Sequence, residues 1–595
     1  MGFLDAVGPA ADEAARQLRL ADDDPATLQH RELMARALTL VGAWVRHLPG
    51  GTAHLPDSEL TTAHGWVRHL AARQSPGGTF VGGDNVLSPP DSAFTVNDVC
   101  DALELLAPYR ASVPAAGALA DDLDAIVHRA TPALLTGGVH TPNHRWEISS
   151  ALARIHRLHP SPQLVERIDE WLAEAPDIDA DGLWSERSPN YAAAVSCPSF
   201  LVLASVLDRP ELLDPVRRSL DATLALLLPD DTVETVQSRR QDQSHPFGIG
   251  AFAPLLWHVA VLDDRADLAA VAARAAVAEM WQPGAVAARA MTDPVLGRPL
   301  PAVAPLPAGS PLTPAVHAFA DARLVHVREP DRSVVLFAGS DVPAEGHVRS
   351  GLANSPTFLR VFSGAVVLSD VRLSREFFGL GPFRPTTLES FGVPESFRVP
   401  QSLGVPESPG VPQPLGVPQP LGAGRFRLTE TVTAGYHQPL PAADRRRDGA
   451  YALGDEGRFS ASMSFGSRAV DTVSLTTTVD VEVTPGAVTL DVTTAGADVP
   501  WSLQLTFRAG GTFTGVSTDR ATGERVLAEG TGTYRVGDSV VSFGPGNGAC
   551  PAQPAFYAPG QDYAFLGGTD RPAGEHVHVT GRSPGTVRVV IGTGR

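Results

Sequence analysis

The chain has 595 residues, of which 43% are hydrophobic and 19% are charged. This length exceeds the size at which one hydrophobic core stops growing, and the composition is typical of globular proteins, so we expect at least two folded domains. The formal net charge of −19 argues against a polyanion held by general electrostatic attraction, so we expect no nucleic-acid partner and disfavour a heavily sulfated substrate.

The amino terminus and the cysteines predict the compartment. Residues 1–6 lack a basic region and lead directly into a helix-prone stretch, so no signal peptide is predicted. No run of about 18 uninterrupted apolar residues occurs, so we expect no membrane association. The three cysteines, Cys100, Cys197 and Cys550, are far apart and odd in number, which is typical of a reducing compartment. Together these features predict a cytoplasmic protein.

Residues 1–298 carry the apolar periodicity of serial α-helices, interrupted at Pro, Gly or Asp. Short connections and a near absence of strand signals indicate paired, layered helices, an arrangement that bundles, solenoids and toroids share. The spacing predicts helices at residues 32–45, 96–106, 118–130, 145–158, 163–173, 191–207, 211–227 and 267–280.

The pattern changes after residue 298. A run rich in Pro, Leu and Ala is typical of an extended linker, which we place at residues 299–315. In residues 316–595 the apolar period becomes two, and regular turns separate the runs, which predicts an antiparallel β-sandwich. The predicted strands are residues 324–328, 333–338, 357–362, 365–368, 473–482, 487–493, 501–507, 540–543 and 587–591.

A low-complexity segment interrupts this second domain. From residue 392 to residue 421 a hexad of the form Gly-Val-Pro-x-x-Leu recurs five times, with deviations. Proline in every hexad removes donors from any strand ladder, and six residues are too few for a solenoid repeat here. We interpret the segment as a polyproline-like insertion, with a partner-binding arm as the alternative.

Three polar runs precede helices and contain the candidate site residues. The first contains Thr141, Asn143 and His144, and Thr141 or Asn143 is placed to cap the following helix. An Asn-His pair at a helix start projects polar groups where amide N–H groups and the helix dipole favour an anion. The structural alternative is a capping residue followed by a buried histidine.

The second run contains Glu186, Arg187 and Tyr191. A phenol beside a carboxylate and a cation is a candidate proton donor or acceptor, since nearby charge and burial both change the acidity of a phenol. The alternative is a tyrosine that packs in the core or caps a helix.

The third run places several hydrogen-bonding side chains within a few residues. Arginine binds carboxylates and amides bind hydroxyls, so the run suits a hydroxylated, carboxylated sugar. A solvated surface loop is an equal alternative. The candidate substrate contacts in this run are Arg239, Arg240, Gln241 and Asp242.

These pieces together resemble the heparinase II/III-like polysaccharide lyases and the related alginate lyases. The resemblance rests on Asn143-His144 at a helix start, on Tyr191 in a Gly-x-x-x-Glu-x-x-x-x-Tyr context, and on the change from helices to strands. It implies an N-terminal (α/α) toroid followed by a C-terminal antiparallel β-sandwich. It also implies a uronate-containing glycan as the substrate, cleaved by β-elimination. Asn143 and His144 would neutralise the carboxylate, His144 would also be available as a base, Tyr191 would protonate the leaving oxygen, and Glu186 would contact substrate.

The sequence departs from that family in the second domain. Many relatives carry a His-x-His-x-Asp-type motif and a later Asp, which supply a catalytic histidine and a zinc site. Here Leu352 stands where a zinc ligand is expected, and leucine cannot ligate, so we predict no metal and no other cofactor. His347 is the candidate replacement for the catalytic histidine, and Asp370 is the later acid. Tyr436 and His437 are candidate substrate contacts, with a surface or packing role as the alternative for each.

Two other functions remain open at this point. A glycoside hydrolase requires two carboxylic acids that flank the scissile bond, and Glu186 with Asp242 is the best pair in the sequence. A non-catalytic glycan-binding or assembly protein is favoured by the altered motif in the second domain.

Overall fold

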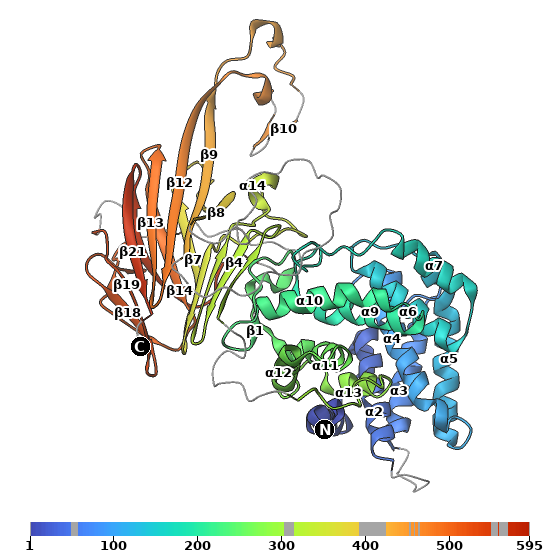
Figure 1. The fold of residues 1–595 in the computed structure, drawn as a ribbon. Coiled ribbons are helices and arrows are strands. Elements are labelled where there is room, and N and C mark those ends of the chain that lie inside the picture. The colour runs from blue at the N-terminus through green and yellow to red at the C-terminus, as the bar shows by residue number, and fades with distance from the viewer. Residues whose placement is uncertain are drawn as a thin grey trace. The chain divides into compact units, whose positions relative to one another are not determined.

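The computed structural model describes residues 2–48, 58–302, 314–391, 424–451, 454–456, 459–461, 464–548, 557, 569 and 571–593. The chain divides into two compact units (Figure 1). Unit 1 comprises Met1–Leu227, Asp231–Val233 and Phe247–Pro311, and unit 2 comprises Leu228–Asp230, Glu234–Pro246 and Leu312–Arg595. The predicted hexad insertion at residues 392–421, most of the predicted linker and Cys550 lie outside the described residues.

Unit 1 is helical, as predicted. Each predicted helix coincides with a helix or a pair of consecutive helices, and one short ladder, β1 (Thr232–Val233) with β2 (Phe247–Gly248), is added. The helices are α1 (Phe3–Leu20), α2 (His30–Arg46), α3 (Ser58–Ala72), α4 (Pro89–Leu106), α5 (Pro114–Thr136), α6 (His144–Leu158), α7 (Pro162–Leu172), α8 (Pro189–Tyr191), α9 (Cys197–Val206), α10 (Asp214–Ala225), α11 (Ala253–Leu262), α12 (Ala266–Ala275) and α13 (Pro283–Ala290).

The helices of unit 1 form an inner and an outer layer. Helices α2, α4, α6 and α9 contact one another in turn, α13 returns to α2, and α3, α5 and α7 pair with the inner helices that precede them. Helix α4 buries 15 of its 18 residues, whereas α7 buries only two of 11. A helix that is apolar on most sides belongs inside, and one with a single apolar stripe belongs outside. This layering is the arrangement of an (α/α) toroid.

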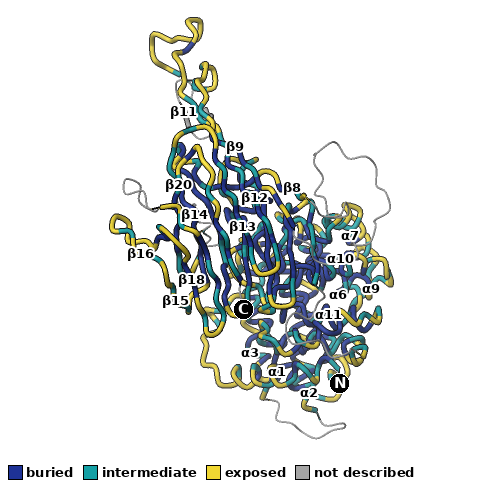
Figure 2. Tube along the Cα trace, turned by 60° about the vertical axis from the view of Figure 1, so that its left-hand side comes forward, coloured by how far each residue is buried: buried dark blue, intermediate teal, exposed yellow. Residues whose placement is uncertain are grey.

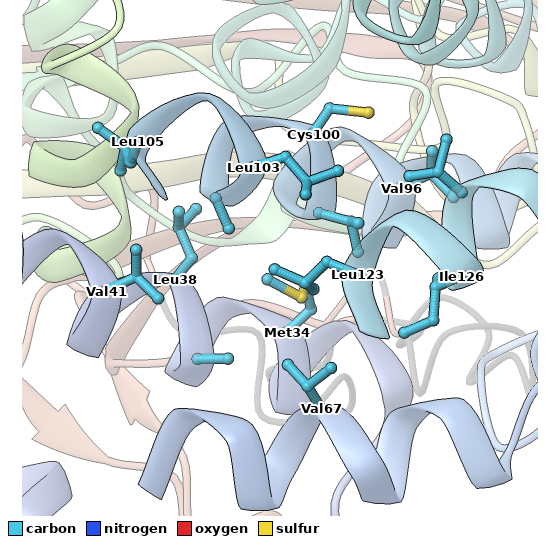
Figure 3. Packing of buried hydrophobic residues seen from close by; sticks show 14 of the residues in the cluster. Met34, Leu38, Val41, Val67, Val96, Cys100, Leu103, Leu105, Leu123 and Ile126 are labelled. Atoms are coloured by element: carbon cyan, nitrogen blue, oxygen red, sulfur yellow. The ribbon is translucent and has the colours of Figure 1, made fainter. Parts of the chain in front are cut away.

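The core between these layers is built from large aliphatic side chains. Figure 3 shows α2 residues such as Met34 and Leu38 meeting Val67 of α3, Leu103 of α4 and Leu123 of α5. Every one of these five side chains is buried. Such packing fixes the beginnings of α2, α4 and α6, where the candidate site lies.

Unit 2 contains two large sheets and one short helix, α14 (Val342–Glu345). The nine-stranded sheet has the order β16-β17-β20-β14-β7-β6-β5-β4-β3, and the eight-stranded sheet has the order β15-β18-β19-β21-β13-β12-β9-β8. The strands are β3 (Ala315–Phe319), β4 (Leu324–Glu329), β5 (Arg332–Phe337), β6 (Leu359–Ser363), β7 (Val366–Arg375), β8 (Thr387–Phe391), β9 (Gly424–His437), β10 (Gly454–Glu456), β11 (Phe459–Ala461), β12 (Val470–Thr484), β13 (Ala487–Gly496), β14 (Pro500–Phe507), β15 (Thr512–Thr514), β16 (Ser517–Thr518), β17 (Arg525–Val526), β18 (Gly532–Val536), β19 (Ser539–Gly544), β20 (Glu575–Arg582) and β21 (Gly585–Gly592).

Alternation along the strands builds the core of unit 2, visible as buried strands in Figure 2. On β14, Leu503 and Leu505 enter this core, whereas Gln504 between them lies on the opposite face. Among the described strands, every ladder is antiparallel except the bridge between β17 and β20. The predicted antiparallel sandwich is confirmed.

One segment belongs to a different unit from the one that its position in the sequence suggests. Residues Glu234–Pro246 lie between α10 and α11, inside the predicted helical domain, yet they group with unit 2. Their polar side chains find partners there: Gln243 accepts a hydrogen bond from the Asn354 backbone over 3.1 Å, and Glu234 forms an ion pair with Arg360.

One helical stretch of the described chain is long and apolar enough to cross a bilayer by length and composition alone. It spans Pro189–Val206, has a mean hydropathy of 1.2, and contains polar residues such as Asn190 and Ser196, so it is not an uninterrupted apolar run. Of this stretch, 56% is buried inside the protein. Such burial is typical of a core helix.

Candidate active site

The side chain of Asn143 is held in one orientation at the start of α6. Its Nδ2 donates to Oε2 of Glu186 over 2.5 Å, and its Oδ1 accepts from Oγ1 of Thr141 over 3.1 Å. Nδ2 carries two N–H groups, and the bond to Glu186 uses one of them. The two bonds therefore determine which end of the amide faces Glu186.

The predicted capping role of this residue is wrong in one respect. Asn143 occupies the N-cap position, but its side chain makes no capping hydrogen bond. The first backbone N–H groups of α6 are taken by turn carbonyls, from His144 to Thr141 over 3.2 Å and from Arg145 to Pro142 over 3.3 Å. These amides are engaged within the chain, so the Asn143 side chain itself is the polar group that this helix start presents.

His144 lies in a cluster of rings and charges contributed by α2, α4 and the loop before α6. Its buried ring meets Phe94 edge-on at 6.4 Å and His140 edge-on at 4.6 Å between centroids. The guanidinium of Arg31 lies 4.1 Å from the centroid of the Phe94 ring and forms an ion pair with buried Asp91. A positive charge thus lies against the ring that contacts His144.

Arg31 also connects this cluster to Tyr191. Burial lowers the pKa of Arg31, and interactions with the negative charges of Asp84, Glu147 and an ionised Tyr191 oppose that shift. Arg31 is therefore within electrostatic range of the Tyr191 oxygen. Arg31 was not predicted as a site residue, because an arginine in the first turn of an amphipathic helix cannot be distinguished by sequence from a solvated one.

The backbone around Tyr191 is constrained. Tyr191 ends α8, and its N–H donates to Oγ of Ser188 over 3.2 Å. It is followed by η3 (Ala192–Ser196), a π-helical segment of the kind that is frequent at functional sites. Arg187 has a φ of +51°, in the left-handed region that costs a non-glycine residue about 1–3 kcal/mol. Tyr191 therefore lies in the first turn of a helical stretch that continues to Val206, close to the helix start predicted for it.

A buried acid, Glu147, lies one helical turn after His144 and was likewise not predicted as a site residue. Its Oε1 accepts from Nδ2 of Asn97 over 2.6 Å. Burial raises the pKa of Glu147 to about 7, while the bond from Asn97 and the charges of Arg154 and Arg31 oppose the shift. With a pKa of about 7, Glu147 titrates near neutral pH.

The third polar run lies in unit 2 and is engaged in contacts there. Arg239 donates from Nε and Nη2 to both carboxylate oxygens of Asp341, over 2.9 and 3.2 Å. Asp242 accepts from Oγ of Ser238 over 2.5 Å. These bonds fix the Glu234–Pro246 segment. Substrate contact remains a prediction for the whole set: Arg239, Arg240, Gln241 and Asp242.

The residues proposed for the altered zinc motif do not form a cluster of ligands. His347 is exposed after α14. Asp370 on β7 accepts from Oγ1 of Thr357 over 2.7 Å, with Arg360 Nη2 at 3.9 Å. Within the part of the chain that the structure describes, no three His, Cys, Asp or Glu side chains converge as metal ligands. The absence of zinc and a catalytic role for His347 stay predictions.

Tyr436 and His437 lie at the end of β9 in unit 2. Tyr436 is 63% exposed and meets Phe378 edge-on at 5.7 Å, and His437 meets Phe465 edge-on at 5.0 Å. Their predicted substrate contact is untested.

Comparison with known proteins identifies the fold. No protein-family model and no curated protein sequence matches the chain. Heparinase III is similar in structure, with a TM-score of 0.50 and 12% identity over 95% of this chain and 77% of that one. The chain has a heparinase-like polysaccharide lyase fold. This confirms the predicted toroid and sandwich, and at this identity the likeness concerns the fold alone.

Two further solved structures are similar at lower TM-scores. The chondroitin AC lyase of Streptomyces coelicolor A3, in complex with chondroitin sulphate, has a TM-score of 0.48 and 15% identity over 98% of this chain and 79% of that one. The heparan sulfate lyase of Pedobacter heparinus has a TM-score of 0.44 and 12% identity over 99% of this chain and 88% of that one.

Proposed function

We propose that the protein is a lyase that cleaves a uronic-acid-containing glycan by β-elimination. The observation that carries the proposal is the arrangement around Arg31: this half-buried cation, paired with buried Asp91, lies 4.1 Å from the centroid of the Phe94 ring that packs on His144, and the charge of Tyr191 acts on its pKa. Asn143, beside His144, is held by Glu186. The heparinase-like fold supports the same reaction class.

Elimination begins with loss of the proton on C5 of the uronate, which places negative charge on the adjacent carboxylate. Hydrogen-bond donors aimed at that carboxylate lower the barrier, because they bind the transition state more strongly than the ground state. In our proposal Asn143 and His144 are these donors. The bonds of Asn143 to Glu186 and Thr141 hold its amide in position, so little reorganisation accompanies the charge shift.

The electrons and protons of the step balance without water. His144 or the Tyr191 phenolate takes the C5 proton, the C–H electron pair becomes the C4–C5 double bond, and the C4–O bond breaks. Tyr191 delivers a proton to the leaving oxygen. Arg31 places a positive charge where it stabilises a transient phenolate. Since no water attacks, a pair of flanking carboxylates is not required.

A panel of uronate oligosaccharides and polymers tests this proposal. A cytoplasmic lyase, as predicted, would meet short imported oligosaccharides, so the panel includes them. Elimination yields an unsaturated product that absorbs in the ultraviolet and adds no water to the summed product mass. We expect Tyr191→Phe to lower kcat by about 10²- to 10⁴-fold. Tyr109→Phe, another half-buried tyrosine of unit 1, is the matched control and should keep wild-type turnover.

The competing hydrolase predicts a different outcome. Product masses increased by one water, together with full activity in Tyr191→Phe and loss of activity in Glu186→Gln or Asp242→Asn, would assign proton transfer to carboxylates and refute the lyase.

A further inference from the structure

A loop of unit 1 lies against Arg31. It comprises residues 82–87, between α3 and the start of α4, and is called the 82–87 loop below. Its Asp84 lies beside α2, where Oδ1 accepts a hydrogen bond from Nε2 of Gln29 over 3.3 Å and Oδ2 lies 3.7 Å from Nη1 of Arg31. The loop is therefore continuous with the cation on which the proposed function depends.

One buried carboxylate, that of Asp91, holds both the loop and this cation. Its Oδ2 accepts two hydrogen bonds from Asn85, one from the backbone N–H over 2.8 Å and one from Nδ2 over 3.1 Å. Its Oδ1 forms the ion pair with Nη2 of Arg31. Burial strengthens these bonds, because the local dielectric constant is low and water does not compete for the oxygens. A single residue thus fixes the loop and Arg31 in one arrangement.

The backbone of the loop packs tightly at Gly83. A Cβ placed there would overlap Nε2 of His30 and lie 3.4 Å from Oδ2 of Asp91, so no side chain fits unless the loop moves. His30 is fully buried, its Nδ1 forms a hydrogen bond with Oγ1 of Thr95 over 2.7 Å, and its ring stacks on Phe80 at 5.3 Å between centroids. These contacts hold His30 in place, so the loop is the part that a side chain at position 83 would displace.

This firmly held loop exposes apolar side chains. Val86 is 93% exposed, and the neighbouring Leu87 is exposed as well, as is Val81 just before the loop. Leu87 has a φ of +47°, a left-handed conformation that is rare for a bulky residue. Apolar side chains that a fixed backbone keeps in water contribute little to the core, and a group of them is typical of a binding surface.

The loop has the chemistry to contact the uncharged parts of a sugar. Asp84 is its only ionisable residue, and this exposed carboxylate accepts hydrogen bonds from hydroxyl groups. The apolar side chain of Val86 suits the C–H face of a pyranose ring. Since Arg31 is already paired with Asp91, the second carboxylate favours hydroxyl donors over a sulfate.

We propose that the 82–87 loop contacts the glycan beside the uronate, through the hydroxyls and the C–H face of the adjoining sugar, and that Asp91 is the positioning residue that holds this loop and Arg31 together. The choice of a glycan as the ligand rests on the proposed function. Displacement of the loop weakens binding, whereas displacement of Arg31 slows the chemical step. Changes to the loop and to Asp91 therefore have different kinetic consequences.

The test of the loop uses oligosaccharides of alginate and of unsulfated chondroitin, with KM and kcat from turnover and Kd from calorimetry in the Tyr191→Phe background. We expect Val86→Ser to raise KM and Kd by about fivefold at unchanged kcat, because it removes an apolar contact made only with the ligand. Val277→Ser is the matched control, since Val277 is a valine of unit 1 that is 76% exposed, and it should leave all three constants unchanged.

A second pair of variants moves the loop through its backbone. Gly83→Ala should raise KM and Kd by about tenfold, because the added Cβ displaces the loop from His30. Gly77→Ala is its control in the same connection between α3 and α4. A Cβ at Gly77 meets only Oγ of Ser75, at 3.7 Å, so this variant should keep the wild-type KM and Kd.

Asp91→Asn tests the positioning role. The neutral amide no longer forms an ion pair with Arg31, so we expect kcat to fall by about tenfold and the pH profile of kcat to be displaced, together with a higher KM. A residue with a purely structural role would lower the thermal unfolding temperature and leave the pH profile where it is in the wild type. An unchanged kcat and pH profile in Asp91→Asn would overturn the positioning role.

Two results would overturn the assignment of the loop. One is a KM and a Kd that both stay within about twofold of the wild type in Val86→Ser and in Gly83→Ala. The other is the absence of binding of any of these oligosaccharides to the protein. Failure of the lyase proposal looks different: the wild-type protein binds an oligosaccharide without turning it over, while Val86→Ser still weakens the Kd.

Discussion

The buried acid Glu147 makes the stability of unit 1 depend on pH in a defined direction. An ordinary glutamic acid titrates near 4.5, and burial raises the pKa of Glu147 to about 7. Between these values the folded protein keeps a proton that the unfolded chain has released. The free energy of unfolding therefore falls by about 3 kcal/mol in total as pH rises from about 4.5 to about 7. Above pH 7 the contribution of Glu147 no longer changes with pH.

Glu147→Gln removes the titrating group and keeps the acceptor that Asn97 Nδ2 contacts at 2.6 Å. We expect the variant to match the wild type near pH 4.5 and to be more stable by about 3 kcal/mol above pH 7. Urea unfolding followed by tryptophan fluorescence measures the difference. Seven of the eight tryptophans lie in unit 1 and only Trp501 lies in unit 2, so the signal reports mainly on unit 1.

The control for this experiment is Glu166→Gln, which alters an exposed glutamate of α7. It should reproduce the wild-type pH dependence. If Glu147→Gln also keeps that dependence, with parallel curves from acid to neutral pH, the assignment of the displaced proton to Glu147 is refuted.

Three further predictions concern catalysis, packing and metal. Arg31→Met should lower kcat by about 10²-fold and displace the pH profile of kcat, whereas Arg31→Lys should restore part of the rate; equal losses with unchanged profiles would show a purely structural role. Leu123→Ala opens a cavity in the fully buried core of unit 1 and should cost about 2–5 kcal/mol by urea unfolding; a cost below about 1 kcal/mol would contradict that packing. Elemental analysis of the purified protein should find no stoichiometric zinc. One zinc per chain would contradict this prediction and make His347 and Asp370 the first candidate ligands.

Much of this architecture was predictable because the period of apolar residues is a local property. All eight predicted helices and all nine predicted strands coincide with observed elements. Strand β9 was not predicted. On β9, Arg425 and Arg427 alternate with Phe426 and Leu428, and the charged residues pair across the strand with β12. From the sequence alone, this alternation of charged and apolar residues resembles a polar stretch.

The sequence by itself determined the change from helices to strands and most of the long elements, and its short motifs identified Asn143, His144 and Tyr191 as candidate site residues. Only the tertiary structure showed that Arg31 joins the surroundings of these motifs, that Glu147 is buried enough to hold a proton near neutral pH, and that Glu234–Pro246 groups with unit 2. The physical reason is that periodicity depends on neighbours in the chain. Burial, ion pairing and the pKa shifts that follow from them depend instead on residues brought together from far apart in the sequence.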